Sequence, residues 1–274
     1  EFWDDYTIEA FDLLVANSRK YSGRFKPLDF SAPAPSYDWL WEGYMAVPDL
    51  AFLVGEPGVG KSWLSMGLAV AIIEEWDTFL GLPLNGGGSV VYVDQENPED
   101  VIRNRFEQLG LTDVGKDKLR FLHFQGVRLD DAEVASDFVE FVDHEQPRLV
   151  IMDSLSTLHT GNENSSQDIM QLWTNALSVI CRTLKVPTLM LHHMTKPQKG
   201  MNATPRGSTS IMQMADAVWR VFGDSVDDLM LAQDKTRRGA SLGHMGYGVV
   251  GNPGEPTMLV PGKRKDASTN GAGW

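Results

Sequence analysis

Cysteine is almost absent from this chain, since Cys181 is the only one in 274 residues. A single cysteine excludes an intrachain disulfide and is typical of a protein of the reducing cytoplasm, and we expect Cys181 to lie in the core on a helix. Long apolar runs are also missing, because no stretch approaches the roughly 20 residues that a membrane span needs. No secretory signal pattern opens the sequence. We therefore expect a cytoplasmic protein without a membrane segment.

Positive charge is scarce as well. The chain has 24 Lys and Arg against 37 Asp and Glu, a formal net charge of −13. This balance argues against nonspecific nucleic-acid binding over the whole surface, although it leaves room for a narrow basic channel. The length allows one large domain or two small ones, and a hydrophobic content of 42% is enough for a substantial core.

What the chain does have is a glycine-rich run that fits the phosphate-binding pattern G-x-x-x-x-G-K-[ST] at every fixed position. Apolar runs before and after it predict a buried strand and a buried helix. Glycines let backbone N–H groups surround phosphate oxygens, and the helix adds its positive end. Lys61 would reach the β- and γ-phosphates and Ser62 would bind Mg²⁺, so we predict ATP and Mg²⁺ as cofactors. The predicted nucleotide-binding residues are Gly55, Glu56, Pro57, Gly58, Val59, Gly60, Lys61, Ser62 and Trp63.

Strand-like and helix-like segments alternate from this run to residue 193, which implies right-handed crossovers and a mainly parallel sheet flanked by helices. The later strands are spaced like antiparallel hairpins. Expected strands are 50–55, 89–94, 119–124, 149–153, 187–193, 217–222, 228–234, 245–250 and 256–260, and expected helices are 61–75, 98–109, 131–144, 166–185 and 208–214.

Three parts follow from these patterns. Residues 1–37 hold an amphipathic helix, expected over 5–18, and a proline-containing linker. Residues 38–261 form the α/β domain, and residues 262–274 form a polar, glycine-rich tail that we expect to be mobile. The opening part is too short to be a domain, so we expect it to pack on its own domain or on another subunit.

Two carboxylates at strand ends are candidates for the chemistry. Asp153 ends an apolar strand in the form of a Walker B element, which holds the metal directly or through water. No Glu follows it, so the attacking water needs another base. The carboxyl ends of parallel strands line the same crevice, which places Glu96, just beyond the second strand, near the γ-phosphate. Asp94 is the rival acid, and Glu96 could instead cap the helix that starts near Pro98.

Two further pairs carry polar groups. Neighbouring residues on a strand point to opposite faces, so His192 and His193 cannot easily chelate one ion, but one of them can contact the γ-phosphate or its water. Lys235 and Arg237 follow a strand and share one face if it continues. They are either solvated cations on a hairpin tip or arginine-finger residues for a phosphate held by a neighbouring subunit.

Together these elements, over about residues 36–260, resemble the RecA-fold ATPases, and among them the hexameric replicative helicases of the DnaB and RepA type. The segment 93–96 is similar to the one that carries the catalytic glutamate of that superfamily, which favours Glu96. The resemblance implies a γ-phosphate sensor at His193, where Gln is commoner. It also implies that Lys235 and Arg237, in the pattern K-x-R-x-G, act as catalytic fingers inserted into the next subunit.

A ring, in our prediction a hexamer, would place the ATP sites between subunits. The polar loop 194–207 would then face the channel, where Lys196, Lys199 and Arg206 could follow a single-stranded DNA backbone by electrostatics. The same loop can also be an ordinary surface loop. We expect an ATP-hydrolysing oligomer that translocates on single-stranded DNA as a replicative helicase. The alternatives are a RecA- or RadA-like recombination ATPase and a KaiC-like signalling ATPase that binds protein and not DNA.

Overall fold

The structure, a computed structural model, describes residues 30–31, 33–34, 36–162, 165–194, 208–251 and 257–265. The chain divides into two units between residues 36 and 37, and the description below concerns the second. The predicted helix over 5–18 lies outside the described residues, as does the end of the predicted tail from residue 266 onward.

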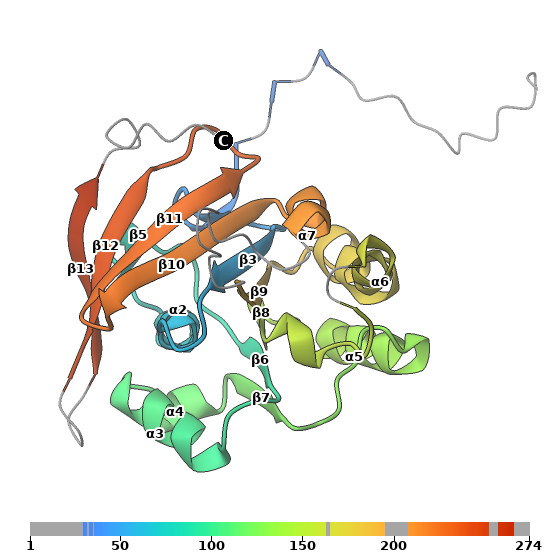
Figure 1. The fold of residues 1–274 in the computed structure, drawn as a ribbon, viewed down its shortest axis with the longest axis horizontal. Coiled ribbons are helices and arrows are strands. Elements are labelled where there is room, and N and C mark those ends of the chain that lie inside the picture. The colour runs from blue at the N-terminus through green and yellow to red at the C-terminus, as the bar shows by residue number, and fades with distance from the viewer. Residues whose placement is uncertain are drawn as a thin grey trace, which may run out of the picture. The chain divides into compact units, whose positions relative to one another are not determined.

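A nine-stranded sheet forms the centre of this unit, in the spatial order β13-β12-β11-β10-β3-β9-β8-β6-β7 (Figure 1). Its strands are β3 (Leu50–Gly55), β6 (Val90–Asp94), β7 (Leu119–His123), β8 (Leu149–Asp153), β9 (Thr188–His193), β10 (Ala217–Ser225), β11 (Asp228–Thr236), β12 (His244–Val250) and β13 (Met258–Lys265). The strands from β10 to β7 are parallel to one another, and β11, β12 and β13 join antiparallel. This confirms the predicted mainly parallel sheet with antiparallel strands at the C-terminal end.

Helices cover both faces of the sheet (Figure 1). One face carries α2 (Lys61–Ile73), α3 (Glu99–Gln108) and α4 (Asp113–Lys116), and the other carries α5 (Ala132–Glu145), α6 (Ser166–Leu172) and α7 (Ser208–Met214). The helix predicted over 166–185 continues from α6 as two π-helical segments, Trp173–Leu177 and Val179–Thr183. Cys181 is fully buried in the second of them. Within the described ranges, no helix is both long enough and apolar enough to cross a membrane.

Alternate side chains of the central strands pack into two separate cores. In β3, Ala51 and Leu53 contact the core beneath α2, whereas Phe52 and Val54 contact the core beneath α5 and α6. All six residues of β3 are buried, as are eleven of the 13 residues of α2. This burial explains why β3 and the part of α2 from residue 66 onward have continuous apolar sequences. The loop between them is consequently held at both ends by well-packed elements.

The differences from the predicted elements are short or polar segments. The hairpin of β1 (Trp39–Trp41) with β2 (Met45–Ala46), and that of β4 (Thr78–Phe79) with β5 (Leu82–Pro83), are too short to show a periodicity. Strand β13 continues to Lys265, so residues 262–265, which the sequence assigns to a mobile tail, belong to the sheet. Backbone pairing, such as that of Lys265 with His244, extends this strand without apolar side chains.

Candidate active site

The phosphate loop, residues 55–62, connects β3 to α2, and its three glycines stand at positions that favour glycine. Gly58 and Gly60 have φ values of 78° and 101°, in the left-handed region that favours glycine. Gly55 lies close to β10, where a Cβ atom would be 2.7 Å from the carbonyl oxygen of Val221. No side chain caps the N-terminus of α2. The first-turn N–H groups of this helix are therefore open to an anion.

The Lys61 side chain folds back onto the loop. Its Nζ donates hydrogen bonds to the carbonyl oxygens of Gly55, at 3.0 Å, and Glu56, at 2.9 Å, and lies 3.2 Å from His193 Nδ1. Burial lowers the pKa of Lys61, while nearby carboxylates, Asp153 foremost, oppose this shift. The ammonium group is thus held in the loop by neutral acceptors, which an anionic phosphate can replace with a stronger, charge-assisted bond.

Ser62 and Asp153, the predicted metal pair, are in direct contact. Ser62 Oγ donates a hydrogen bond of 2.7 Å to Asp153 Oδ2. Asp153 ends β8 and is only 3% exposed, and burial raises its pKa to about 7. A hydroxyl and a carboxylate are the oxygen ligands that Mg²⁺ prefers, and a cation would compensate the buried charge. The two residues therefore fit a Mg²⁺ ion that binds together with a triphosphate.

Asp94, the rival acid, uses its carboxylate for hydrogen bonds to the turn that follows it. Its side chain is fully buried, and Oδ1 accepts hydrogen bonds from the backbone N–H groups of Glu96 and Asn97, both at 2.9 Å. Asn97 Nδ2 donates a third, of 2.8 Å, to Oδ2. Helix α3 is preceded by Pro98 and has no side-chain cap, so Glu96 does not serve as its cap. Asp94 shapes the turn that presents Glu96.

The Glu96 carboxylate lies at the same edge of the sheet as the phosphate loop. Its Oε1 accepts a hydrogen bond of 2.5 Å from Ser154 Oγ and one of 3.4 Å from Ser156 Oγ, while Oε2 lies 3.7 Å from His193 Nε2. His193 first, and then the serine hydroxyls, hold the pKa of Glu96 at about 2. A carboxylate with so low a pKa orients a water molecule better than it retains a proton.

The two histidines point to opposite faces of β9, as strand alternation predicts. His192 is buried in the sheet with 1% exposure. His193 lies at the site, where its ring separates the Lys61 ammonium from the Glu96 carboxylate. A group that touches both is suitably placed to respond to a γ-phosphate, and the sensor role of His193 stays a prediction.

Lys235 and Arg237 lie far from this chain's own phosphate loop. Lys235 pairs with Val218, and Val218 pairs with Phe52, three residues before the loop begins. Figure 1 shows the same separation, because α7 and the start of β10 lie at one end of the sheet and α2 begins at the other. The structure therefore does not bring these two cations to the residues around Lys61.

Both cations bind the C-terminal end of α7. Lys235 Nζ donates to the carbonyl oxygens of Met212 and Ala215, the latter at 2.7 Å. Arg237 Nη2 donates to the carbonyl oxygen of Gln213 at 2.7 Å. These bonds satisfy helix-end carbonyls, where positive charge is favourable. The side chain of Arg237 nevertheless stays 50% exposed, so the alternative of solvated cations stays open beside the finger role.

Of the remaining predicted residues, the structure describes Trp63 but not the three basic residues of the loop after β9. Trp63 is half-buried beside α3, with the Arg105 guanidinium 5.3 Å from its ring. Lys196, Lys199 and Arg206 lie outside the described residues. Sequence reasoning missed Ser154 and Ser156 as partners of Glu96, because only the folded sheet brings residues 58 positions apart into contact.

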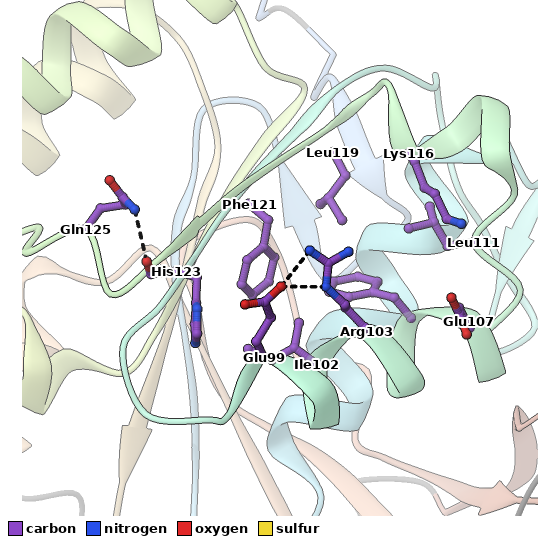
Figure 2. Close-up of a pocket in the computed structure, with 11 residues that line it drawn as sticks. Glu99, Ile102, Arg103, Glu107, Leu111, Lys116, Leu119, Phe121, His123 and Gln125 are labelled. Atoms are coloured by element: carbon purple, nitrogen blue, oxygen red, sulfur yellow. Dashed lines mark hydrogen bonds and ion pairs between the residues drawn. The ribbon is translucent and has the colours of Figure 1, made fainter.

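Two cavities lie near these elements. A cleft of about 650 Å³ opens beside residues 56–59 of the phosphate loop and is closed on its far side by the β10–β11 hairpin. A second cavity, of about 490 Å³, lies between α3 and the edge strand β7. Figure 2 shows its mixed lining, in which apolar side chains such as Phe121 lie beside the Glu99–Arg103 ion pair. The second cavity contains none of the predicted site residues, so it adds nothing to the site.

Comparison with known proteins agrees with this fold. Residues 21–199, more than half of the chain, match the protein family described as AAA domain. No curated protein matches the chain. A similar solved structure is that of a KaiC-like protein from the hyperthermophilic archaeon Pyrococcus horikoshii. It has a TM-score of 0.57 and 17% sequence identity, over 84% of this chain and 96% of that one. At this identity the likeness shows the fold alone, which is the RecA-like α/β fold.

Proposed function

Because the chain belongs to the AAA domain family of RecA-like P-loop ATPases, we propose that it hydrolyses ATP as an oligomer and uses this reaction to move along single-stranded DNA. The observation that carries the proposal is the convergence of four side chains at one edge of the sheet: Lys61, Ser62, Asp153 and Glu96. Lys61 and Ser62 begin α2, Asp153 ends β8, and Glu96 follows the neighbouring parallel strand β6.

Each group has a separate task in this proposal. The loop N–H groups and Lys61 bind the phosphates. Ser62 and Asp153 hold Mg²⁺, which neutralises charge on the phosphate oxygens when it is bound. Glu96 orients the attacking water, and His193, between Lys61 and Glu96, senses the γ-phosphate. Positioning and electrostatics are what phosphoryl transfer requires of a protein.

The oligomeric part of the proposal rests on Lys235 and Arg237. They lie at the end of the sheet opposite to the phosphate loop, so they can serve only a phosphate held by another copy. Arginine-finger residues supplied in trans stabilise transition-state charge in this way. In such an assembly the pair would exchange its carbonyl partners on α7 for a neighbour's nucleotide, and each site would need two subunits.

The DNA-binding part rests on the loop that follows β9. This strand ends at His193, and the next residue, Met194, donates its backbone N–H to the carbonyl oxygen of Gly55 at 3.0 Å. The loop with Lys196, Lys199 and Arg206 thus begins at the phosphate loop itself. A change at the nucleotide can therefore reach the start of this loop through the hydrogen bond between Met194 and Gly55.

A second candidate function is a signalling ATPase of the KaiC-like kind that acts on proteins and not on DNA. The net charge of −13 favours it, because a DNA-binding protein more often carries excess positive charge. A recombination ATPase of the same fold would form filaments on DNA.

The test is the rate of Mg²⁺-dependent ATP hydrolysis with and without single-stranded DNA, together with the mass of the protein in solution. We expect a ring-sized oligomer and stimulation by single-stranded DNA. Replacing Lys196, Lys199 and Arg206 with Ala should abolish the stimulation, whereas the charge-matched replacement of Arg103, Lys116 and Lys118 should preserve it. An ATP hydrolysis rate that single-stranded DNA does not change would favour the signalling function. Formation of filaments on DNA without strand displacement would favour recombination.

A further inference from the structure

The turn after β8 contains two serines that belong to neither the phosphate-binding nor the metal-binding motif. Asp153 is followed by Ser154 and then by a 3₁₀ turn, η1 (Leu155–Thr157), which contains Ser156. Ser154 is fully buried. A buried hydroxyl needs hydrogen-bond partners, and those that this structure gives Ser154 Oγ are Glu96 Oε1, at 2.5 Å, and Ser156 Oγ, at 2.7 Å.

The direction of these bonds follows from the number of protons. Ionised Glu96 can only accept, so Ser154 uses its single hydroxyl proton to donate to Oε1. The bond between the two serines must then be donated by Ser156. The result is a chain of hydrogen bonds, donated from Ser156 to Ser154 and from Ser154 to Glu96. The bonds in such a chain polarise and strengthen one another. It fixes one carboxylate oxygen and leaves the other, Oε2, facing His193.

The backbone of the turn is fixed independently of these hydroxyls. The N–H of Thr157 donates to the carbonyl oxygen of Ser154 at 3.1 Å, and its hydroxyl donates to the same oxygen at 2.9 Å. Ser154 therefore has a fixed Cα position from which its side chain reaches Glu96. Removing its hydroxyl would leave the turn intact and free the carboxylate to rotate.

We propose that Ser154, supported by Ser156, is a positioning residue that holds the Glu96 carboxylate with Oε2 directed at the attacking water. This inference rests on the proposed hydrolysis of ATP. A reacting group that is displaced by about 1 Å can lose on the order of a hundredfold in rate. Ser154→Ala should accordingly lower kcat by about 10- to 100-fold and leave the dissociation constant for ADP unchanged. Ser156→Ala should have a smaller effect on kcat, because Ser156 donates its proton to Ser154 and its own oxygen lies 3.4 Å from Glu96 Oε1.

The matched control is Thr157→Val, which removes a hydroxyl from the same turn without touching Glu96. It should leave kcat within about twofold of the wild type, since it breaks no bond to the carboxylate. A loss equal to that of Ser154→Ala would show that the turn as a whole matters, and would overturn the positioning role.

The decisive experiment is a double-mutant cycle of Ser154→Ala with Glu96→Ala, read as single-turnover ATP hydrolysis. If Ser154 acts through Glu96, adding Ser154→Ala to Glu96→Ala should change the residual rate by less than about twofold. A further loss as large as in the wild-type background would overturn the inference, as would normal kcat in Ser154→Ala. A wild-type protein that does not hydrolyse ATP would instead refute the proposed function, and this inference with it.

Discussion

Asp153 is a buried carboxylate whose charge is only partly compensated by the residues around it. Burial raises its pKa, while the bond from Ser62 and the nearby Lys61 oppose the shift without cancelling it. Without Mg²⁺, this residue therefore costs the folded protein stability at neutral pH. A metal ligand that is destabilising in the metal-free protein is physically reasonable, because the ion restores the balance when it binds.

The corresponding prediction concerns pH. The pKa of Asp153 rises from 3.8 to about 7 on folding, so the folded state binds more protons than the unfolded state between these values. Its contribution to the free energy of unfolding is fully present below about pH 4 and is lost as the pH rises to about 7. The difference between the wild type and Asp153→Asn should then decrease with pH, by up to about 1.4 kcal/mol per pH unit.

Urea unfolding at a series of pH values, in the absence of nucleotide and Mg²⁺, measures this difference. Asn cannot titrate, so all other groups cancel in the comparison. A difference between the two proteins that does not change with pH would contradict the raised pKa of Asp153.

For single residues, the sequence predicts those whose spacing along the chain is set by a binding motif, as in the phosphate loop. Lys61 and Ser62 follow from one local pattern, and the approach of Asp153 to Ser62 follows once parallel strands are assumed. The bond from Ser154 to Glu96 does not follow, because serine is common in turns and nothing local marks its partner. The contacts of Lys235 with α7 could not be predicted from the sequence either, because nothing near Lys235 marks its partners.

Among the elements, α5 has a clear local cause for its starting point. Asp131 precedes it, and its Oδ1 accepts hydrogen bonds from the backbone N–H groups of Glu133, at 3.0 Å, and Val134, at 3.2 Å. Replacing such a cap with Ala typically costs about 1 kcal/mol. We expect Asp131→Ala to lower the free energy of unfolding by about this amount.

The control for this prediction is Asp137→Ala, which makes the same chemical change on the exposed side of the same helix. Ala is the better helix former there, so stability should stay unchanged or rise slightly. Denaturant unfolding compares the two variants with the wild type. Equal losses from both would show that charge, and not capping, is responsible.

Elements that bury a long apolar pattern are predictable from the sequence, and those held by backbone pairing alone are not. β3 and most of α2 are of the first kind, because they are buried and consist mainly of apolar residues. The end of β13 is of the second kind, since residues 262–265 are polar or small, and Arg264 and Lys265 pair through their backbone with β12. The π-helical segments after α6 likewise leave no trace in the apolar pattern.

For the molecule as a whole, the separation of Lys235 and Arg237 from Lys61 has a consequence in assemblies. If each site takes its phosphate loop from one subunit and its finger from the next, Lys61→Ala and Arg237→Ala should each be inactive alone. Mixing the two variants should restore activity, because some interfaces then receive an intact Lys61 and an intact Arg237. Random mixing would restore about a quarter of the interfaces.

Subunit exchange followed by an ATPase assay measures this restoration. Two copies of Lys61→Ala carrying different tags serve as the control, since they exchange subunits without regaining a complete site. An Arg237→Ala oligomer with full activity would exclude the trans-acting role.

The central claim is that the groups around the phosphate loop hydrolyse ATP. The most direct measurement is the rate of Mg²⁺-dependent ATP hydrolysis by the wild type and by Lys61→Ala, with Lys116→Ala as a lysine control on the exposed helix α4. We predict hydrolysis by the wild type and by Lys116→Ala, and a loss of at least about a hundredfold in Lys61→Ala. Hydrolysis by Lys61→Ala at the wild-type rate would contradict the account.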